Sequence, residues 1–311
     1  MTNSPLPASH SLRSRLLRLI TRWLIAPIFQ SGYAPDVQRR KLERITQLSQ
    51  LLMPSGLRFT QNPLGGVPTE WTENLRAETQ GHLLYFHGGA YIVGSPATHR
   101  NLTAHLAKRC GLRVASVDYR LAPEHPFPAA TDDALAAYRG LLAQGIAPNK
   151  ILIGGDSAGG GLTLACALAI RDAGLPLPAG LICISPWADL TLSGESMTQQ
   201  RDTEVILTPQ VLADTAAQYL GKTSAQHPLA SPLFADLSGL PPVLIQVTDA
   251  EVLYSDSTRF AEAAARQGVQ TTLQVAPGLW HDWQLYAGQM PEADVALQHI
   301  KQFCDERLKS A

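Results

Sequence analysis

From about residue 80 onward, the sequence alternates short, strand-forming apolar runs with longer stretches rich in alanine and leucine. Five runs and a less apolar sixth are predicted to be strands: 82–86, 113–119, 151–154, 181–185, 243–247 and 271–275. Four longer stretches are predicted to be helices: 129–144, 160–173, 255–267 and 292–308. Repeated strand–helix units build a mainly parallel sheet, and continuous apolar runs are typical of strands covered on both faces. The chain is therefore predicted to fold as an α/β protein.

One connection is too long for this pattern. Between residues 187 and 240 the chain travels more than fifty residues from one predicted strand to the next. Loops of that length without secondary structure are uncommon in compact domains. We therefore expect an inserted helical segment. Together, residues 1–50 and 187–230 are expected to form a cap over one end of the sheet, with 51–311 as the main domain.

The composition argues against a nucleic-acid partner and against a metal site. The 311 residues include 25 Lys and Arg against 26 Asp and Glu, so the chain has no basic excess with which to neutralise the phosphates of a nucleic acid. The nine histidines show no metal-binding spacing such as H-E-x-x-H, and the four cysteines form no C-x-x-C pair. We expect no nucleic-acid partner, no metal, no cofactor, and reduced cysteines in the core.

The N-terminal segment 11–30 mixes apolar and basic residues. Its arginines interrupt every apolar run well short of the roughly 20 residues that a membrane-spanning helix needs, and no continuous apolar stretch ends in the cleavage site of a secretory signal. Because an amphipathic stripe is usually buried against protein, we favour a packed helix over one that lies on a membrane surface. We accordingly expect a cytoplasmic protein. The arginines are Arg13, Arg15, Arg18 and Arg22.

The most specific chemical motif is the G-x-S-x-G at 155–159, which directly follows the predicted strand 151–154 and directly precedes a predicted helix. At this place the motif forms a sharp turn that projects the serine hydroxyl near the amino end of the following helix. Ser157 is therefore the candidate nucleophile. Asp156 beside it is predicted to be a supporting hydrogen-bond group.

A second glycine-rich turn, HGGA at 87–90, follows the predicted strand 82–86. A carbonyl attacked by serine becomes an oxyanion, which preformed N–H donors must stabilise. Gly88 and Gly89 can expose such donors because they lack a Cβ. Ala158, the residue after the serine, is expected to add a third N–H group.

A serine nucleophile needs a base, and a third group must orient that base. In folds with this turn the chain order is serine, acid, histidine, so both partners are expected after Ser157. Of the histidines there, His227 falls in the inserted segment and His299 in the last predicted helix. His281 lies in the loop after the last predicted strand, where the base is expected.

Three carboxylates compete for the role of the acid, and all follow the predicted strand 243–247. Asp256 opens a predicted helix, where capping or compensation of the helix dipole explains an acidic residue. Asp249 fits an Asx turn within the loop. Glu251 lies between them, and the residues alone leave the three alternatives open.

These motifs resemble those of the bacterial hormone-sensitive-lipase-like esterases, often called family IV esterases. The resemblance covers about residues 80–300 and includes DYRLAPEHPFPAA at 118–130, SPL at 231–233 and LPP at 240–242. It implies an α/β-hydrolase fold with a helical cap. It also implies a carboxylesterase, a serine hydrolase that acts on small-molecule esters with short- to medium-chain acyl groups.

The resemblance further implies roles for individual residues. It favours Glu251 as the acid, because 251–256 occupies the place of the family's D-P-L-R-D motif with Glu in place of Asp. Ala90 stands where the family usually has glycine. The family also favours a homodimer, and its caps cover an acyl pocket. The candidate walls of that pocket are Tyr91, Trp187, Trp280 and Trp283.

These expectations combine into two-step acyl transfer through a covalent acyl-enzyme, with Ser157, His281 and Glu251 as the triad. Two other interpretations remain. A non-catalytic protein of the same fold that binds a small ligand would be expected to have lost its base. A membrane-surface lipase would use the segment 11–30 to bind lipid. An amidase or acyltransferase would use the same triad.

Overall fold

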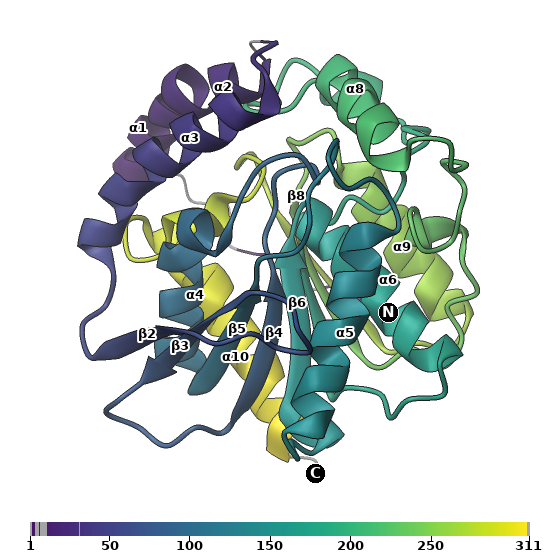
Figure 1. Ribbon diagram of the computed structural model, residues 1–311. Helices are drawn as coiled ribbons and strands as arrows, with labels where there is room; N and C mark the ends of the chain where they lie inside the picture. The colour runs from purple at the N-terminus through teal and green to yellow at the C-terminus, as the bar shows by residue number, and fades with distance from the viewer. Residues whose placement is uncertain (1, 4–5, 7–10, 31, 310–311) are drawn as a thin grey trace.

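The computed structural model describes residues 2–3, 6, 11–30 and 32–309, which form a nine-stranded sheet covered by helices (Figure 1). The strand order across the sheet is β1-β9-β8-β7-β6-β4-β5-β3-β2. β3 pairs antiparallel with β2 and β5, and the other pairings are parallel. The α/β class predicted from the sequence is confirmed. The strands are β1 (Thr2–Asn3), β2 (Leu57–Gln61), β3 (Thr69–Asn74), β4 (Gly81–Phe86), β5 (Leu112–Val117), β6 (Ile151–Asp156), β7 (Gly180–Ile184), β8 (Val243–Thr248) and β9 (Thr271–Ala276).

Helices cover both faces of this sheet. One face carries α4 (Pro96–Cys110) and α10 (Pro291–Lys309), and the other carries α5 (Ala129–Ala143), α6 (Ala158–Asp172) and α9 (Tyr254–Arg266). Successive side chains of one strand point to opposite faces. In β4, Leu83 and Tyr85 therefore pack in the core under α4, while Leu84 and Phe86 pack in the core under α5 and α6. This division explains the continuous apolar runs of the central strands.

The predicted strands and helices lie within two residues of their observed bounds, but the sequence prediction missed β1, β2, β3 and α4. β2 and β3 form a hairpin at the edge of the sheet, and they are rich in charged and polar residues. α4 does carry end signals. Ser95 caps its first turn and Pro96 opens it, and Gly111 follows it with a left-handed φ of 64°. These signals predict the helix even though its apolar pattern is weak.

Helical segments from two distant parts of the chain lie at the same end of the sheet, as Figure 1 shows for α1–α3 and α8. Gln30 Nε2 donates to Ile206 O at 2.9 Å and joins the two parts, while Arg39 Nη2 donates to Ala122 O at 2.9 Å. The N-terminal part contains α1 (Leu12–Ile20), the π-helical turn η1 (Thr21–Ile25), α2 (Ala26–Gln30), α3 (Pro35–Thr46) and the 3₁₀ helix η2 (Gln47–Leu52). The insertion contains α7 (Ser196–Gln199), α8 (Pro209–Leu220) and the 3₁₀ helix η4 (Pro232–Phe234).

The orientation of α1 and η1 contradicts the sequence prediction. A buried apolar stripe was expected, but Ser14 and Thr21 face the protein. The apolar stripe faces outward, with exposed fractions of 81% for Leu12, 59% for Leu16 and 73% for Trp23. Small polar side chains allow α1 to pack closely against the first turn of α10, where the N-cap residue Ser11 donates its Oγ–H to the Glu292 carboxylate. Within the described residues, no helix is both long and apolar enough to cross a bilayer.

Candidate active site

Ser157 lies in a sharp turn between β6 and α6, with the backbone angles φ 52° and ψ −119°. A positive φ is strained for a residue with a side chain and requires support from its neighbours. Ser157 N–H donates to Ile184 O at 2.8 Å, which holds the turn against β7. Gly159 is needed because a Cβ there would lie 2.0 Å from Phe86 O. The motif therefore fixes the serine at the carboxyl end of the central strands.

A chain of hydrogen bonds connects the serine to a carboxylate through His281. His281 Nε2 lies 2.9 Å from Ser157 Oγ, and Nδ1 lies 3.1 Å from Glu251 Oε1. Glu251 is fully buried, and its Oε2 accepts a hydrogen bond from Ser185 Oγ at 2.8 Å. The three groups come from the loops after β6, β8 and β9, so the parallel sheet brings them to one edge.

The electrostatics around His281 favour its charged form. Burial lowers the pKa of the imidazole, but the carboxylates of Asp282 and Glu251 more than offset burial and raise the pKa well above its ordinary value. The two carboxylates therefore stabilise the imidazolium that forms after the ring has accepted a proton, while the ring must be neutral to act as a general base.

The other two candidate acids lie elsewhere and bind backbone groups. Asp249 Oδ1 accepts the N–H of Gly278 at 2.7 Å, which ties the loop after β8 to the loop after β9. Asp256 Oδ2 accepts the N–H groups of Ala188 and Asp189 at 2.9 and 2.8 Å, which ties α9 to the start of the insertion. Both carboxylates therefore have positions that fit a structural role.

Asp282 is a second carboxylate beside the imidazole, and the sequence analysis did not consider it. Its Oδ2 lies 3.1 Å from His281 Nε2, on the side of the ring that faces Ser157. Its Oδ1 has no hydrogen-bond partner among the described residues, and Asp282 lines the cavity described below. Burial raises the pKa of Asp282 to about 7, although the nearby imidazole lowers it. The signal available in the sequence was its position directly after His281.

The glycine-rich turn after β4 departs from the prediction for Gly88. Its N–H donates to Asp156 Oδ2 at 3.1 Å, and a Cβ at Gly88 would lie 2.2 Å from the same oxygen. The Gly88 N–H is therefore occupied by the carboxylate. Asp156 also accepts hydrogen bonds from Tyr85 Oη and His99 Nε2, which together hold it beneath the turn.

The donors suited to an oxyanion are consequently the next N–H groups along the turn. Gly89 has a φ of 123° and Ala90 a φ of 53°, and within the described residues neither N–H donates a hydrogen bond. Ala158, the first residue of α6, presents its N–H at the positive end of that helix. Of the three donors predicted from the sequence, Gly89 and Ala158 therefore have N–H groups suited to this role, and Ala90 has a third, whereas the N–H of Gly88 is occupied.

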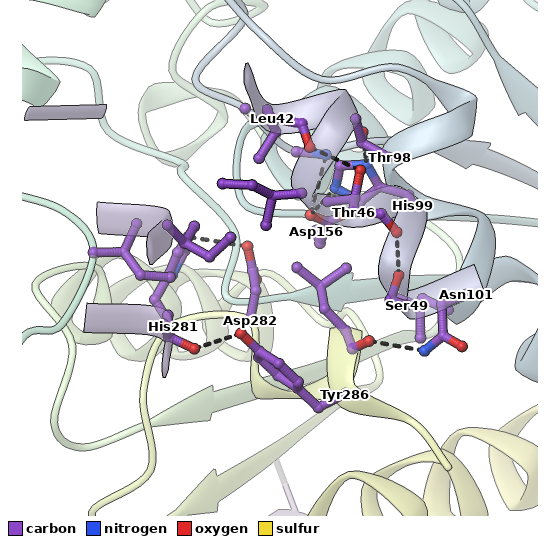
Figure 2. A pocket seen from close by; sticks show the side chains of 18 of the residues that line it. Leu42, Thr46, Ser49, Thr98, His99, Asn101, Asp156, His281, Asp282 and Tyr286 are labelled. Atoms are coloured by element: carbon purple, nitrogen blue, oxygen red, sulfur yellow. Dashed lines mark hydrogen bonds and ion pairs between the residues drawn. The ribbon is translucent and has the colours of Figure 1, made fainter. Parts of the chain in front are cut away.

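A cavity of about 320 Å³ reaches these groups. Figure 2 shows Leu42 and Thr46 of α3 in the upper part of the view and His281 and Asp282 below them, all lining the cavity. The apolar side chains that line it come mostly from the N-terminal helices and the insertion. They are Leu17, Ile20, Leu24, Ile25, Phe29, Leu42, Ile45, Leu48, Leu52, Ile206 and Leu207, with Leu102 and Leu285 from the main domain.

The four aromatic residues proposed as pocket walls do not line this cavity. Tyr91, Trp187, Trp280 and Trp283 are at most 1% exposed and pack in the hydrophobic core. Tyr91 stacks on Tyr219 with ring centroids 3.8 Å apart, beneath the turn that carries the N–H donors. Their large apolar surfaces stabilise the loops around the site.

Glu204 connects the cavity wall to the loop after β8. Its Oε1 accepts the N–H groups of Val205, Ile206 and Leu207 at 2.8, 2.8 and 3.3 Å, and its Oε2 accepts the N–H of Val252 at 3.1 Å. Burial raises the pKa of Glu204, although the imidazole of the site lowers it. One carboxylate therefore ties the segment that contains Ile206 and Leu207 to the loop that carries Glu251.

The described residues contain no group of three or more His, Cys, Asp or Glu side chains that could hold a metal ion. All four cysteines are free thiols and buried. Burial raises the pKa of Cys166 and Cys183. The groups that line the cavity near Ser157 include its hydroxyl, the imidazole of His281 and the carboxylates of Asp156 and Asp282.

Comparison with known proteins assigns the fold to a class. A family model described as the alpha/beta hydrolase fold matches residues 83–285. The crystal structure of an esterase from the bacterial hormone-sensitive lipase family is 39% identical, with a TM-score of 0.91 and coverage of 96% of this chain and 99% of that chain. The chain belongs to the α/β-hydrolase family and, within it, to the bacterial hormone-sensitive-lipase-like esterases. The resemblance inferred from the motifs is confirmed.

Two curated relatives are similar over most of their length. An acetyl-hydrolase of Streptomyces hygroscopicus is 45% identical over 235 residues, which are 76% of this chain and 78% of that protein. An esterase of Acinetobacter venetianus is 38% identical over 283 residues, which are 88% of this chain and 90% of that protein.

Proposed function

We propose that this protein is a carboxylesterase that hydrolyses short- to medium-chain acyl esters through Ser157, His281 and Glu251. The observation that carries the proposal is the continuous chain of hydrogen bonds from Ser157 Oγ through the imidazole to the Glu251 carboxylate, at the wall of an apolar cavity. The names of the related acetyl-hydrolase and esterases support the same class of reaction.

In the proposed mechanism, His281 Nε2 accepts the hydroxyl proton of Ser157 as Oγ attacks the ester carbonyl. Nδ1–H remains donated to Glu251, which orients the ring and stabilises the imidazolium. The N–H groups of the turn after β4 and of the first residue of α6 hold the oxyanion. Nε2–H then protonates the departing oxygen, and the alcohol leaves an acyl group on the serine.

The second half of the reaction repeats these roles with water. His281 Nε2 takes a proton from water as the water oxygen attacks the acyl carbon. The oxyanion forms again, and it collapses when Nε2–H protonates Ser157 Oγ. The carboxylic acid is released and the free hydroxyl is regenerated, so no external cofactor is consumed.

The proposed substrate class follows from the cavity. Its volume of about 320 Å³ lies near the lower end of the roughly 300–1,000 Å³ typical of small-molecule sites. Away from the catalytic groups its lining is mainly apolar, with polar residues such as Thr46, Ser49 and Asn101 among the leucines and isoleucines, so an alkyl acyl chain can be buried against the apolar part. We propose that residues 1–50 and 187–230 act as the cap that limits acyl length over the catalytic domain 51–311.

A panel of p-nitrophenyl esters from acetate to palmitate tests the proposal. We expect kcat/KM to be highest for short and medium acyl groups, and Ser157→Ala to abolish turnover while its thermal unfolding stays close to wild type. Loss of the serine should also abolish covalent labelling by a fluorophosphonate probe. Wild-type turnover by Ser157→Ala would refute the mechanism.

The same probe separates the proposal from a non-catalytic binding protein of this fold. A binding protein would bind an ester without forming a covalent adduct, whereas an activated serine should react with the fluorophosphonate and gain the mass of the phosphonyl group. Matched amide and ester substrates then separate an amidase from an esterase.

A further inference from the structure

The exposed large hydrophobic residues are concentrated in two segments of the N-terminal part. Nine of the twelve exposed large hydrophobic residues lie on the outward side of α1 and η1 or on η2. We call these nine residues the outer apolar face. They are Leu12, Leu16, Leu19, Ile20, Trp23, Leu24, Leu48, Leu51 and Leu52. Both segments contact α3, and such a group of exposed hydrophobic residues indicates an interaction site, since a soluble protein normally scatters them singly.

The outward direction of this face is built into α1 and η1. Leu12, Leu16, Leu19 and Trp23 follow the spacing that places residues on one side of a helix, and all four are more than half exposed. A helix of a globular protein normally turns such a stripe toward the core. Here the opposite side packs inward, so the apolar side remains free to contact another surface.

The charged residues of α1 and η1 themselves are all arginines. Arg13, Arg15 and Arg22 are exposed, and none of them forms an ion pair within the described residues. The first acidic residue of the whole chain is Asp36. A second copy of this chain is therefore a poor occupant, because a two-fold interface would bring the same unpaired arginines toward each other. An anionic surface complements them.

The mouth of the cavity opens within the same face. Ile20, Leu24, Leu48 and Leu52 are exposed, and each also lines the cavity that reaches Ser157. The helices that carry them, α1–α3 in Figure 1, lie together over the carboxyl end of the sheet. A surface placed against the outer apolar face would therefore touch the rim of the cavity.

We propose that the outer apolar face binds the surface of an anionic lipid bilayer, with α1 and η1 lying in the interface. Leucine side chains and Trp23 enter the boundary between head groups and acyl chains, and the arginines contact lipid phosphates. The cavity then opens toward the lipid and takes its esters from there. This last step rests on the proposed esterase function, whereas the binding itself does not.

Tryptophan fluorescence tests the binding directly. Trp23 is 73% exposed, and the other four tryptophans are at most 1% exposed, so a change in emission on adding vesicles reports on Trp23. With phosphatidylcholine vesicles that contain phosphatidylglycerol, we expect a saturable blue shift and protection from acrylamide quenching. Emission unchanged at every lipid concentration, together with protein that stays in the supernatant on co-sedimentation, would overturn the proposal.

Substitutions separate the apolar and the ionic contributions. Arg13→Gln, Arg15→Gln and Arg22→Gln should each weaken co-sedimentation with the anionic vesicles about fivefold, since a basic residue near such a surface contributes about 1 kcal/mol. The triple variant should therefore bind about 100-fold more weakly, and high salt should weaken the wild type in the same direction. Binding by the triple variant equal to that of the wild type would contradict the proposal.

Leu16→Gln combined with Leu19→Gln should weaken co-sedimentation more than tenfold. The matched control is Leu75→Gln, because Leu75 is 58% exposed but lies just after β3, outside the outer apolar face. We expect the control to bind like the wild type. If the control loses as much vesicle binding as the double variant, the outer apolar face is not the binding site. If the wild type does not bind vesicles and the double variant only dissociates a dimer, the face serves another role.

Activity distinguishes failure of the binding from failure of the esterase mechanism. Leu16 and Leu19 do not line the cavity, so the double variant should hydrolyse a water-soluble acetate ester at the wild-type rate. It should lose only the added rate on an ester embedded in anionic vesicles. A wild type that binds vesicles but hydrolyses no ester would refute the proposed function alone.

Discussion

Replacing Glu251 by glutamine should invert the hydrogen bonding of the histidine. Glu251 Oε2 accepts from Ser185 Oγ at 2.8 Å and from Thr248 N–H at 3.4 Å, while Oε1 accepts from His281 Nδ1. A glutamine would keep its oxygen on the side of the two donors and present its NH₂ group to His281. Nδ1 would then become an acceptor and Nε2 would carry the proton, so Nε2 could not accept the proton of Ser157.

The expected loss follows from that change of tautomer. A wrong tautomer at the histidine of a serine triad lowers kcat by about 10⁴, which corresponds to about 5.4 kcal/mol of transition-state stabilisation. We expect Glu251→Gln to lower kcat for p-nitrophenyl butyrate by this order, with the circular dichroism spectrum unchanged. A residual rate above a tenth of the wild type would refute the argument.

Two further variants test the cause of the loss. Asp249→Asn should keep nearly full activity, because Asp249 accepts the Gly278 N–H and an amide oxygen can do the same. Adding Ser185→Ala to Glu251→Gln should restore part of the rate, because the amide then loses the hydroxyl that holds its oxygen away from the histidine. Loss of activity confined to Asp249→Asn would instead assign the acid to that residue.

Three other changes have defined outcomes. Asp282→Asn removes a carboxylate that raises the pKa of His281. Because the base must be neutral, the acidic limb of the pH profile of kcat/KM should move to lower pH. An acidic limb that stays in place or moves to higher pH would contradict this. Gly159→Ala places a Cβ 2.0 Å from Phe86 O and should cost about 1–3 kcal/mol in urea unfolding, so an unchanged midpoint would be evidence against the tight turn. Leu207→Trp adds bulk at the cavity wall and should lower kcat/KM for hexanoate more than for acetate in the ester panel.

The parallel part of the fold could be predicted because the sheet is covered on both faces. Full burial forces continuous apolar runs, and the runs that correspond to β4–β9 marked their strands within two residues. The hairpin of β2 and β3 could not be found in the same way, because it lies at the edge and its side chains are largely polar. α4 was missed for another reason: its apolar pattern is weak, and only its end signals identify it.

The candidate site, too, could be predicted only in part from the sequence. Ser157 and His281 are tied to chain order and to the ends of strands, so their sequence context was enough to bring them into the prediction. The choice of N–H donors depends on the direction of the peptide groups after β4. Asp156, at the end of β6, accepts the N–H of Gly88 and leaves the next N–H groups of the turn available. The inward packing of large aromatics such as Trp187 also depends on tertiary contacts that no local pattern encodes.

The direction of α1 shows a limit of periodicity. The spacing of Leu12, Leu16 and Leu19 defines an apolar side of the helix, but the spacing contains no information on whether that side meets the core or the outside. In the structure Ser14 and Thr21 on the opposite side are the buried residues of the two segments.

The contacts of Glu204 have a consequence for protein engineering. Residues 206 and 207 form part of the cavity wall, and they are natural targets for libraries that change acyl selectivity. The same carboxylate also fixes Val252 in the loop that carries the acid. Grafting this stretch from a homologue without an equivalent of Glu204 should therefore disturb turnover as well as selectivity, so recombination boundaries are best placed to inherit both partners together.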